Sequence, residues 1–287
     1  MKAGRIGLAS GQGRYVLITG ASSGIGHAAA LALARRGYTV FATVRKKSDA
    51  DALGGLGLPG LIPVWPVDVT DPAQIDRAVG FVKKEIGQRG GDGLWALVNN
   101  AGGGGPAPVE LMSPDVFHTE LRARVLGPVL LVQALLPLLR RGPGRIVWIM
   151  TPALIPTPYV SSIHACDFAA NALARTLDIE LKPWRIPNIM IRCGGIKTPA
   201  GMRTVSDIEA VLRDGPLDRV SLYEKALRKW ANDMTAFDKK RTDAQKVAEI
   251  VVRALTVKNP NGGTRLATWP GPAPSWNRCH SPAPTGS

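Results

Sequence analysis

A short apolar run followed at once by a glycine-rich turn places the strongest constraint on the fold of this chain. The run Tyr15–Ile18 reads Tyr-Val-Leu-Ile, and residues 19–26 continue as Thr-Gly-Ala-Ser-Ser-Gly-Ile-Gly. Side chains at Gly20, Gly24 or Gly26 would block the tight turn or the approach of a phosphate to it. A helix that begins at such a turn presents unpaired N–H groups and a positive dipole end, which favour anions. The segment therefore predicts a strand, a turn and a helix whose N-terminus binds a dinucleotide pyrophosphate.

Apolar strand-like runs alternate with amphipathic helical stretches from Tyr15 to about Trp269. The apolar runs are nearly continuous, as is typical of strands that are buried on both faces of a parallel sheet. The pattern therefore predicts an α/β fold with a doubly wound parallel sheet. The expected strands are Tyr15–Thr19, Thr39–Val44, Leu61–Val67, Leu94–Val98, Arg145–Met150, Asn188–Cys193 and Arg265–Trp269, and the expected helices cover residues 24–36, 72–87, 114–140, 160–182 and 243–256.

The 287 residues have room for one large α/β domain with an ample core. We expect residues 1–13 to be a flexible lead and residues 14–270 to form this single domain. Residues 198–242 break the strand–helix rhythm, are mostly helical in pattern and are rich in charge. Residues 271–287 are rich in Pro, Gly and Ser, and this composition predicts a disordered tail.

The composition, with 45% hydrophobic and 20% charged residues, is ordinary for a soluble enzyme. We find no apolar run of 18 or more residues and no apolar leader, so we expect no membrane span and no secretion signal. The three cysteines have no metal-ligand spacing, and we interpret them as cytosolic thiols, which favours a cytoplasmic protein without a metal site. The net charge of +14 comes from short, scattered basic groups without a nucleic-acid motif, so we expect no nucleic-acid partner.

A second motif joins the glycine-rich turn. The run Leu97–Gly102, which reads Leu-Val-Asn-Asn-Ala-Gly, follows another expected strand. The two motifs in this order resemble the short-chain dehydrogenase/reductase family, and Val252–Leu255 favours its retinol- or hydroxysteroid-dehydrogenase-like branch. The resemblance covers roughly residues 14–256. It implies a Rossmann-type domain in which residues 198–242 form a small helical lobe over a small-molecule substrate, and it implies a homodimer.

The resemblance also implies a nicotinamide-dinucleotide site. No acidic residue follows the second expected strand to hold a ribose 2′-hydroxyl, and Arg45 begins a basic cluster instead. Because Arg45 suits a 2′-phosphate, we expect NADP(H) rather than NAD, although the cluster has the composition of a solvated loop as well. The expected cofactor-binding residues are Gly20, Ser22, Ser23, Gly24, Ile25, Gly26, Arg45, Asp68, Val69, Asn99, Ala101, Gly102, Ile196 and Thr198.

The positions that carry the chemistry of the family are altered. The family uses an Asn, a Ser, a Tyr and a Lys, and the last two are spaced Tyr-x-x-x-Lys. Here Arg124 stands in the Asn position, Ile163 in the Tyr position and Asp167 in the Lys position. Thr151 fits the Ser position best, with Met150 as the alternative. Because Ile163 has no proton to give, we expect carbonyl reduction to lose the general-acid contribution, about 10²–10⁴ in rate.

Arg124 and Asp167 allow two interpretations. In the first interpretation, the cation and the carboxylate, at two family positions that lie close together in the fold, form a compensating ion pair. In the other, Asp167 is a desolvated general acid or base, with help from Thr151. His164 is a further catalytic candidate, although one helical step turns it about 100° from Ile163.

Three functions follow from this altered site. We favour a non-redox cyclase, isomerase or lyase that acts on an apolar or polyketide-like small molecule and keeps NADP(H) in a structural role. An NADP-dependent oxidoreductase with an unorthodox proton donor is the first alternative. A nucleotide-binding pseudoenzyme that acts as a scaffold or regulator is the second.

Overall fold

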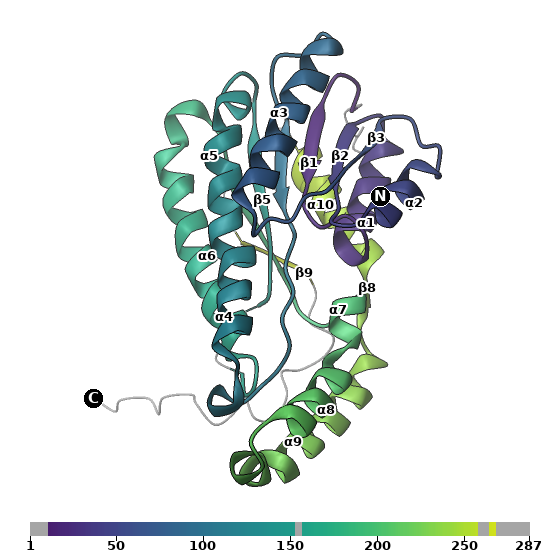
Figure 1. Cartoon of the computed structure of the whole chain (residues 1–287). Helices are drawn as coiled ribbons and strands as arrows, with labels where there is room; N and C mark the ends of the chain where they lie inside the picture. The colour runs from purple at the N-terminus through teal and green to yellow at the C-terminus, as the bar shows by residue number, and fades with distance from the viewer. Residues whose placement is uncertain (1–10, 153–156, 258–263, 268–287) are drawn as a thin grey trace, which may run out of the picture.

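Seven strands form one parallel sheet in the order β3-β2-β1-β4-β5-β6-β9 (Figure 1). The computed structural model describes residues 11–152, 157–257 and 264–267. The order reverses direction after β1, as in a doubly wound sheet, so the predicted fold class is confirmed. The strands are β1 (Tyr15–Ile18), β2 (Thr39–Thr43), β3 (Leu61–Val64), β4 (Ala96–Asn99), β5 (Arg145–Met150), β6 (Asn188–Cys193) and β9 (Thr264–Ala267).

Helices cover both faces of this sheet and bury two apolar cores. Figure 1 places α5 and α6 on one side of the sheet and α1 and α10 on the other. Leu33 of α1 and Val251 of α10 belong to one core, and Val82 of α3 and Leu135 of α5 belong to the other. The helices on the first face are α1 (Gly24–Ala34), α2 (Lys47–Gly54) and α10 (Ala244–Thr256), and those on the second are α3 (Pro72–Gln88), α5 (Gly127–Leu139) and α6 (Ser161–Glu180).

Side-chain caps define where two of these helices begin. The Asp71 carboxylate accepts hydrogen bonds from the backbone N–H groups of Ala73 and Gln74, at 2.9 and 3.2 Å, and so caps α3. The Asp243 carboxylate caps α10 in the same way, at 2.7 Å from the nitrogen of Gln245. Helix α1 differs, because its N-cap residue Ser23 makes no side-chain hydrogen bond. The first N–H groups of α1 therefore lack the side-chain partner that stabilises an ordinary helix start.

The charged region after β6 folds into a small helical lobe at the carboxyl edge of the sheet (Figure 1). Ile208, Leu212 and Leu227 form an apolar cluster of their own inside the lobe. A two-stranded parallel ribbon of β7 (Ile196–Lys197) and β8 (Thr242–Asp243) joins the lobe to the domain. The lobe helices are α7 (Pro199–Met202), α8 (Thr204–Asp214) and α9 (Leu217–Asp238), and shorter elements elsewhere are η1 (Val109–Leu111), α4 (Pro114–Leu121) and η3 (Lys182–Trp184).

Some details differ from the sequence expectations. Helix α2 was not predicted, because its eight residues contain one large apolar side chain, Leu53, and carry no helix-start signal beyond Asp49. The expected helix over residues 114–140 is continuous but contains a π-helical turn, η2 (Arg122–Leu126). Gly11 is buried and donates a hydrogen bond to the carbonyl of Arg36, within the stretch expected to be a flexible lead. Residues 1–10 and the expected tail 271–287 lie outside the described residues, as do the last two residues of the expected strand Arg265–Trp269.

The continuous helical segment Pro114–Leu139 is also unusually apolar. By length and composition alone it could cross a membrane, and 39% of its most apolar window is buried. The core helix of a soluble protein meets the same criterion, so this property does not assign the segment to a membrane. The expectation of a protein without a membrane span stays a prediction.

Candidate functional site

The glycine-rich turn has the geometry of an anion-binding helix start. Gly20 and Gly24 have φ angles of +66° and +59°, a region in which side chains are strained. A Cβ atom at Gly26 would lie 2.5 Å from the carbonyl oxygen of Gly20, so only glycine allows α1 to pack this closely against the turn. Ser22 and Ser23 are exposed at the start of α1. The turn and the uncapped N–H groups of α1 therefore fit a bound phosphate.

Two residues that were not in the expected cofactor set, Thr19 and Asn100, connect this turn to the end of β4. The Asn100 side-chain amide donates to the carbonyls of Thr19 and Gly20, at 2.8 and 3.1 Å. The Thr19 hydroxyl accepts hydrogen bonds from the backbone N–H groups of Asn100 and Ala101, both at 2.9 Å. Both residues belong to the two motifs, so the sequence contained the signal. They hold Gly20 and Ala101 at the same edge of the sheet.

Other expected cofactor residues lie along that edge. Asp68 follows β3, and its carboxylate accepts hydrogen bonds from the backbone N–H and the hydroxyl of Thr70, at 2.9 and 2.8 Å. Val69 is buried beside it. Asn99 ends β4 and is 5% exposed, and neither polar atom of its side chain has a hydrogen-bond partner among the described residues. Gly102 faces Arg124, because a Cβ at Gly102 would lie 3.3 Å from the guanidinium carbon.

The remaining expected cofactor residues lie on either side of α1. Arg45 is exposed just after β2, and no hydrogen bond or ion pair holds it within the part of the chain that the structure describes. Ile196 is buried in β7. Thr198 caps α7 with its hydroxyl, 3.0 Å from the nitrogen of Gly201, and its methyl group would lie 2.9 Å from a Cβ at Gly24. Thr198 therefore closes over the glycine-rich turn from the lobe side.

Asp167 is the centre of the altered positions. It lies on α6 and is 4% exposed. One carboxylate oxygen, Oδ1, lies 3.1 Å from the Arg124 guanidinium. The other, Oδ2, accepts hydrogen bonds from the backbone N–H and the hydroxyl of Thr151, at 2.7 and 2.6 Å. The ion pair that the sequence allowed as one interpretation is present, and both oxygens of Asp167 are engaged.

Arg124 lies in the π-helical turn η2, a type of irregularity that often accompanies functional sites. Its guanidinium also donates to the carbonyl oxygen of Gly103. Its second acidic neighbour, Glu120, was not among the expected site residues, although the spacing of four residues on a helix was a usable signal. The Glu120 carboxylate lies 3.8 Å from Nε of Arg124 and accepts a hydrogen bond from the Ser162 hydroxyl at 3.2 Å. Two acidic side chains therefore flank one guanidinium.

Glu120 is the less satisfied of the two acids. It is 4% exposed, and its Oε2 atom has no hydrogen-bond partner among the described residues. Burial raises the pKa of Glu120, and the nearby Arg124 charge offsets part of this effect. A carboxyl group in such surroundings retains its proton to higher pH than an exposed one.

The other candidates at this site offer little acid–base chemistry. Ile163 is half-buried and apolar. Burial lowers the pKa of His164, and its Nδ1 atom is buried without a hydrogen-bond partner within the described ranges. Burial raises the pKa of Cys166 to about 11 and that of Cys193 to about 12, so neither thiol ionises readily at neutral pH.

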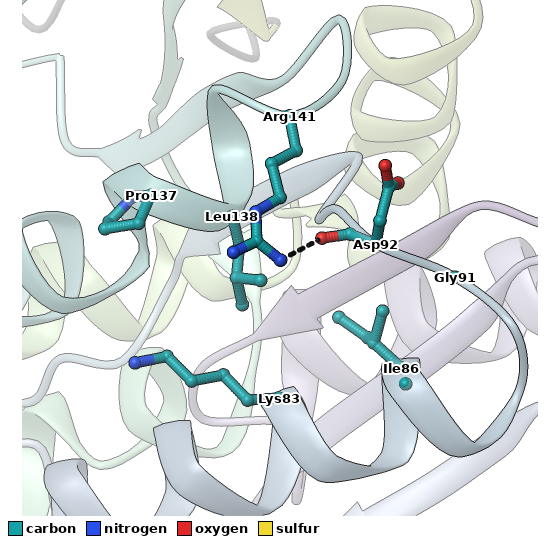
Figure 2. A pocket seen from close by; sticks show the side chains of 8 residues that line it. Lys83, Ile86, Gly91, Asp92, Pro137, Leu138 and Arg141 are labelled. Atoms are coloured by element: carbon teal, nitrogen blue, oxygen red, sulfur yellow. Dashed lines mark hydrogen bonds between the residues drawn. The ribbon is translucent and has the colours of Figure 1, made fainter.

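Two cavities lie in different parts of the molecule. A small one of about 20 Å³, large enough for about one water molecule, is lined by Asn99, Arg124 and Asp167 among others. A larger one of about 260 Å³ is lined by residues of α3 and α5 and of the loops that precede β4 and β5. Figure 2 shows Arg141 at this second cavity, with its guanidinium directed at the backbone carbonyl of Asp92, 3.2 Å away. This cavity lies at the amino ends of the strands, away from every expected site residue, so we place the site at the carboxyl edge.

Comparisons with known proteins agree with this geometry. A family model described as short chain dehydrogenase matches residues 14–209. The chain is 36% identical over 191 residues to 11-beta-hydroxysteroid dehydrogenase type 2 of Ovis aries, covering 64% of this chain and 43% of the sheep protein. It therefore spans less than half the length of that curated relative.

Two further comparisons cover a larger share of the protein that is compared with this chain. The chain is 31% identical over 214 residues to a 3-amino-tetrahydro-pyrrolizinone reductase of Xenorhabdus hominickii, covering 74% of this chain and 72% of that protein. Among solved structures, a 3-ketoacyl-(acyl-carrier-protein) reductase of Brucella melitensis complexed with NADH superposes with a TM-score of 0.70. That match has 22% sequence identity and covers 90% of this chain and 96% of the other, so it concerns the fold alone.

Proposed function

Because the chain belongs to the short-chain dehydrogenase family, with relatives on its hydroxysteroid-dehydrogenase-like branch, we propose that it binds a nicotinamide nucleotide and does not run the usual carbonyl reduction. In this proposal the protein is a nucleotide-dependent binder of a small molecule. The Tyr–Lys proton relay of the family is replaced by a buried ion-pair network.

The residues at the carboxyl edge fit such a nucleotide. The turn at Gly20, Gly24 and Gly26 leaves room for the pyrophosphate beside the uncapped start of α1. Thr198 approaches this turn from the lobe, and Asp68 and Asn99 extend the edge toward the adenosine side that the family resemblance implies. When bound, a nicotinamide nucleotide supplies or accepts a hydride.

We assign the nucleotide as NADP(H) on the basis of Arg45. It lies two residues after the end of β2, is exposed and has no partner in the described ranges, whereas the nearby Lys47 is paired with Asp51 at 2.7 Å. A free guanidinium at this position suits the 2′-phosphate of NADP(H), because it can form two parallel hydrogen bonds to phosphate oxygens.

One observation carries the proposed loss of carbonyl reduction, namely that both oxygens of Asp167 are engaged by Arg124 and Thr151. The residue in the Lys position is therefore a buried carboxyl group held by Arg124 and Thr151, and Ile163 provides no phenol beside it. An alkoxide formed by hydride transfer would meet neither the family's acid nor its cation. We infer that the network of Arg124, Asp167 and Thr151 stabilises the fold and replaces the Tyr–Lys proton relay of the family.

Nucleotide binding is tested by calorimetric titration with NADPH. The wild-type protein is expected to bind it, and Gly24→Val to lose binding, because a side chain there meets Thr198 and the bound phosphate. Gly87→Val is the matched control, since a Cβ at Gly87 on α3 meets nothing within 4 Å. Equal affinity of both variants for NADPH would contradict the assigned site.

Glu120 favours a second candidate function, an enzyme in which this buried acid supplies the proton. The burial of Glu120, the lack of a hydrogen-bond partner at its Oε2 within the described residues, and its raised pKa are properties of a general acid, although Oε2 also lies 3.8 Å from Nε of Arg124. This candidate covers the non-redox cyclase, isomerase or lyase that acts on an apolar small molecule, and also an oxidoreductase with an unorthodox donor. An oxidoreductase would oxidise NADPH during turnover, whereas a cyclase, an isomerase or a lyase would leave it reduced.

A further inference from the structure

The Thr151 hydroxyl has a fixed direction of hydrogen bonding. Its oxygen lies 2.6 Å from Oδ2 of Asp167. That carboxylate oxygen already accepts the Thr151 backbone N–H at 2.7 Å, and Oδ1 accepts an N–H of Arg124 at 3.1 Å. An N–H group can only donate, so the carboxylate is the acceptor in both contacts. Because both oxygens of Asp167 accept N–H groups, one of them from the Arg124 guanidinium, we take Asp167 as the acceptor of the short contact with the hydroxyl as well, so that Thr151 donates.

This direction changes what Thr151 offers to a ligand. A hydroxyl has one proton and two acceptor sites, and the proton is committed to Asp167. Thr151 is half-buried and directly follows β5 at the carboxyl edge of the sheet, and we consider a ligand that meets the remaining side of its oxygen there. What remains there is a hydrogen-bond acceptor. Ile163, in the neighbouring family position, adds no donor.

We propose that this site selects ligands that present a hydrogen-bond donor to Thr151, an alcohol O–H or an amine N–H, over ligands that present a carbonyl oxygen. A carbonyl oxygen is only an acceptor, and placing it against a second acceptor leaves both unsatisfied in a partly desolvated site. The inference deepens the proposed function by naming the class of small molecule, and it rests on that function only in placing the ligand beside the nucleotide site.

The matched probes for this inference are cyclohexanol and cyclohexanone, which have similar size and differ in the donor. Each is titrated into the full-length protein, and the amide resonance of Thr151 is followed by NMR. Cyclohexanol is expected to bind about threefold to tenfold more tightly, as for one ordinary hydrogen bond. Thr151→Val, which keeps the shape and removes the acceptor, is expected to abolish the preference. Thr151→Ser is expected to keep it.

Three results would overturn the inference. They are equal or tighter binding of cyclohexanone, a preference that survives in Thr151→Val, and the absence of any shift at Thr151 with cyclohexanol. NADPH affinity is measured on the same preparation. A protein that fails to bind NADPH but prefers cyclohexanol contradicts the proposed function and supports this inference. A protein that binds NADPH but shows no preference for cyclohexanol supports the proposed function and contradicts this inference.

Discussion

The carboxylate of Asp167 and the guanidinium of Arg124 form an ion pair at 3.1 Å, although the two residues lie 43 positions apart in the chain. Asp167 is 4% exposed, and the Arg124 side chain is 15% exposed. Each charge is therefore largely removed from water and needs compensation. Arg124 compensates Asp167, and Asp167, together with Glu120 at 3.8 Å, compensates Arg124. Arg124 in the Asn position and Asp167 in the Lys position of the family pattern are therefore best understood as one coupled change.

A double-mutant cycle tests this dependence. Asp167→Asn is expected to remove the nearer of the two acids beside the buried Arg124 charge, leaving Glu120 at 3.8 Å, and to lower the free energy of unfolding by up to about 3–5 kcal/mol. Arg124→Met is expected to have a similar effect, and the double variant to recover part of the loss, because neighbouring sites couple by about 0.5–3 kcal/mol. Urea unfolding of the four proteins measures these energies. Additive losses would show that the pair is not coupled.

Arg45→Asp tests the choice between the two nucleotides. The substitution places a negative charge where the account puts the 2′-phosphate, so the affinity for NADPH is expected to fall by tenfold or more, about 1.4 kcal/mol. The affinity for NADH is expected to change much less. Lys84→Asp is a control for net charge, since it lies on α3, away from the site. An equal loss of affinity for both nucleotides in Arg45→Asp would remove the phosphate role.

Glu120 predicts a pH dependence of stability. Its pKa is raised in the folded state, so folding retains this proton, and the associated stability is present below the ordinary pKa of a glutamate. That contribution is lost as pH rises through the raised pKa. Glu120→Gln removes this titration. The free energy of unfolding of the variant, relative to that of the wild type, is therefore expected to increase from about pH 4, near the ordinary pKa of a glutamate, to about pH 8. A difference that is constant with pH would contradict the buried acid.

The expected homodimer is a prediction about the outer face of α5 and α6. Leu126, the last residue of the η2 turn just before α5, and Phe168 on α6 are large apolar side chains that are 50% and 43% exposed. If this face joins two copies, Phe168→Arg is expected to convert the dimer to a monomer in sedimentation or light-scattering measurements. Leu222→Arg, on the lobe helix α9, is the control and is expected to leave the mass unchanged. A wild-type monomer at micromolar concentration would refute the prediction.

The sequence predicted the fold well because its signals are local. The glycine-rich turn after β1 and the Asn-Asn-Ala-Gly run after β4 each follow a buried strand, and strand ends in a parallel sheet meet at one edge. The family relationship, with its hydroxysteroid-dehydrogenase-like relatives, is confirmed by the comparisons.

The details of the site were less predictable, because they depend on side-chain directions. The Arg124–Asp167 contact was one of two interpretations, but nothing in the sequence indicated that Thr151 gives both of its donors to Asp167. Glu120 was missed because an acidic residue on an amphipathic helix is usually exposed, and its burial follows from packing against α6. Assignment of catalytic roles to Asp167, Thr151, Arg124 and His164 stays a prediction.

The central claim is that the chain binds NADP(H) without the proton relay that carbonyl reduction requires. The most direct test follows the absorbance of protein-bound NADPH in the presence of a panel of cyclic and steroid ketones. The wild-type protein is expected to leave NADPH reduced, while the triple variant Arg124→Asn, Ile163→Tyr, Asp167→Lys, which restores the family residues and removes the stranded Arg charge, is expected to oxidise it measurably. Oxidation by the wild-type protein at ordinary enzyme rates, about 1–10³ per second, would contradict the account.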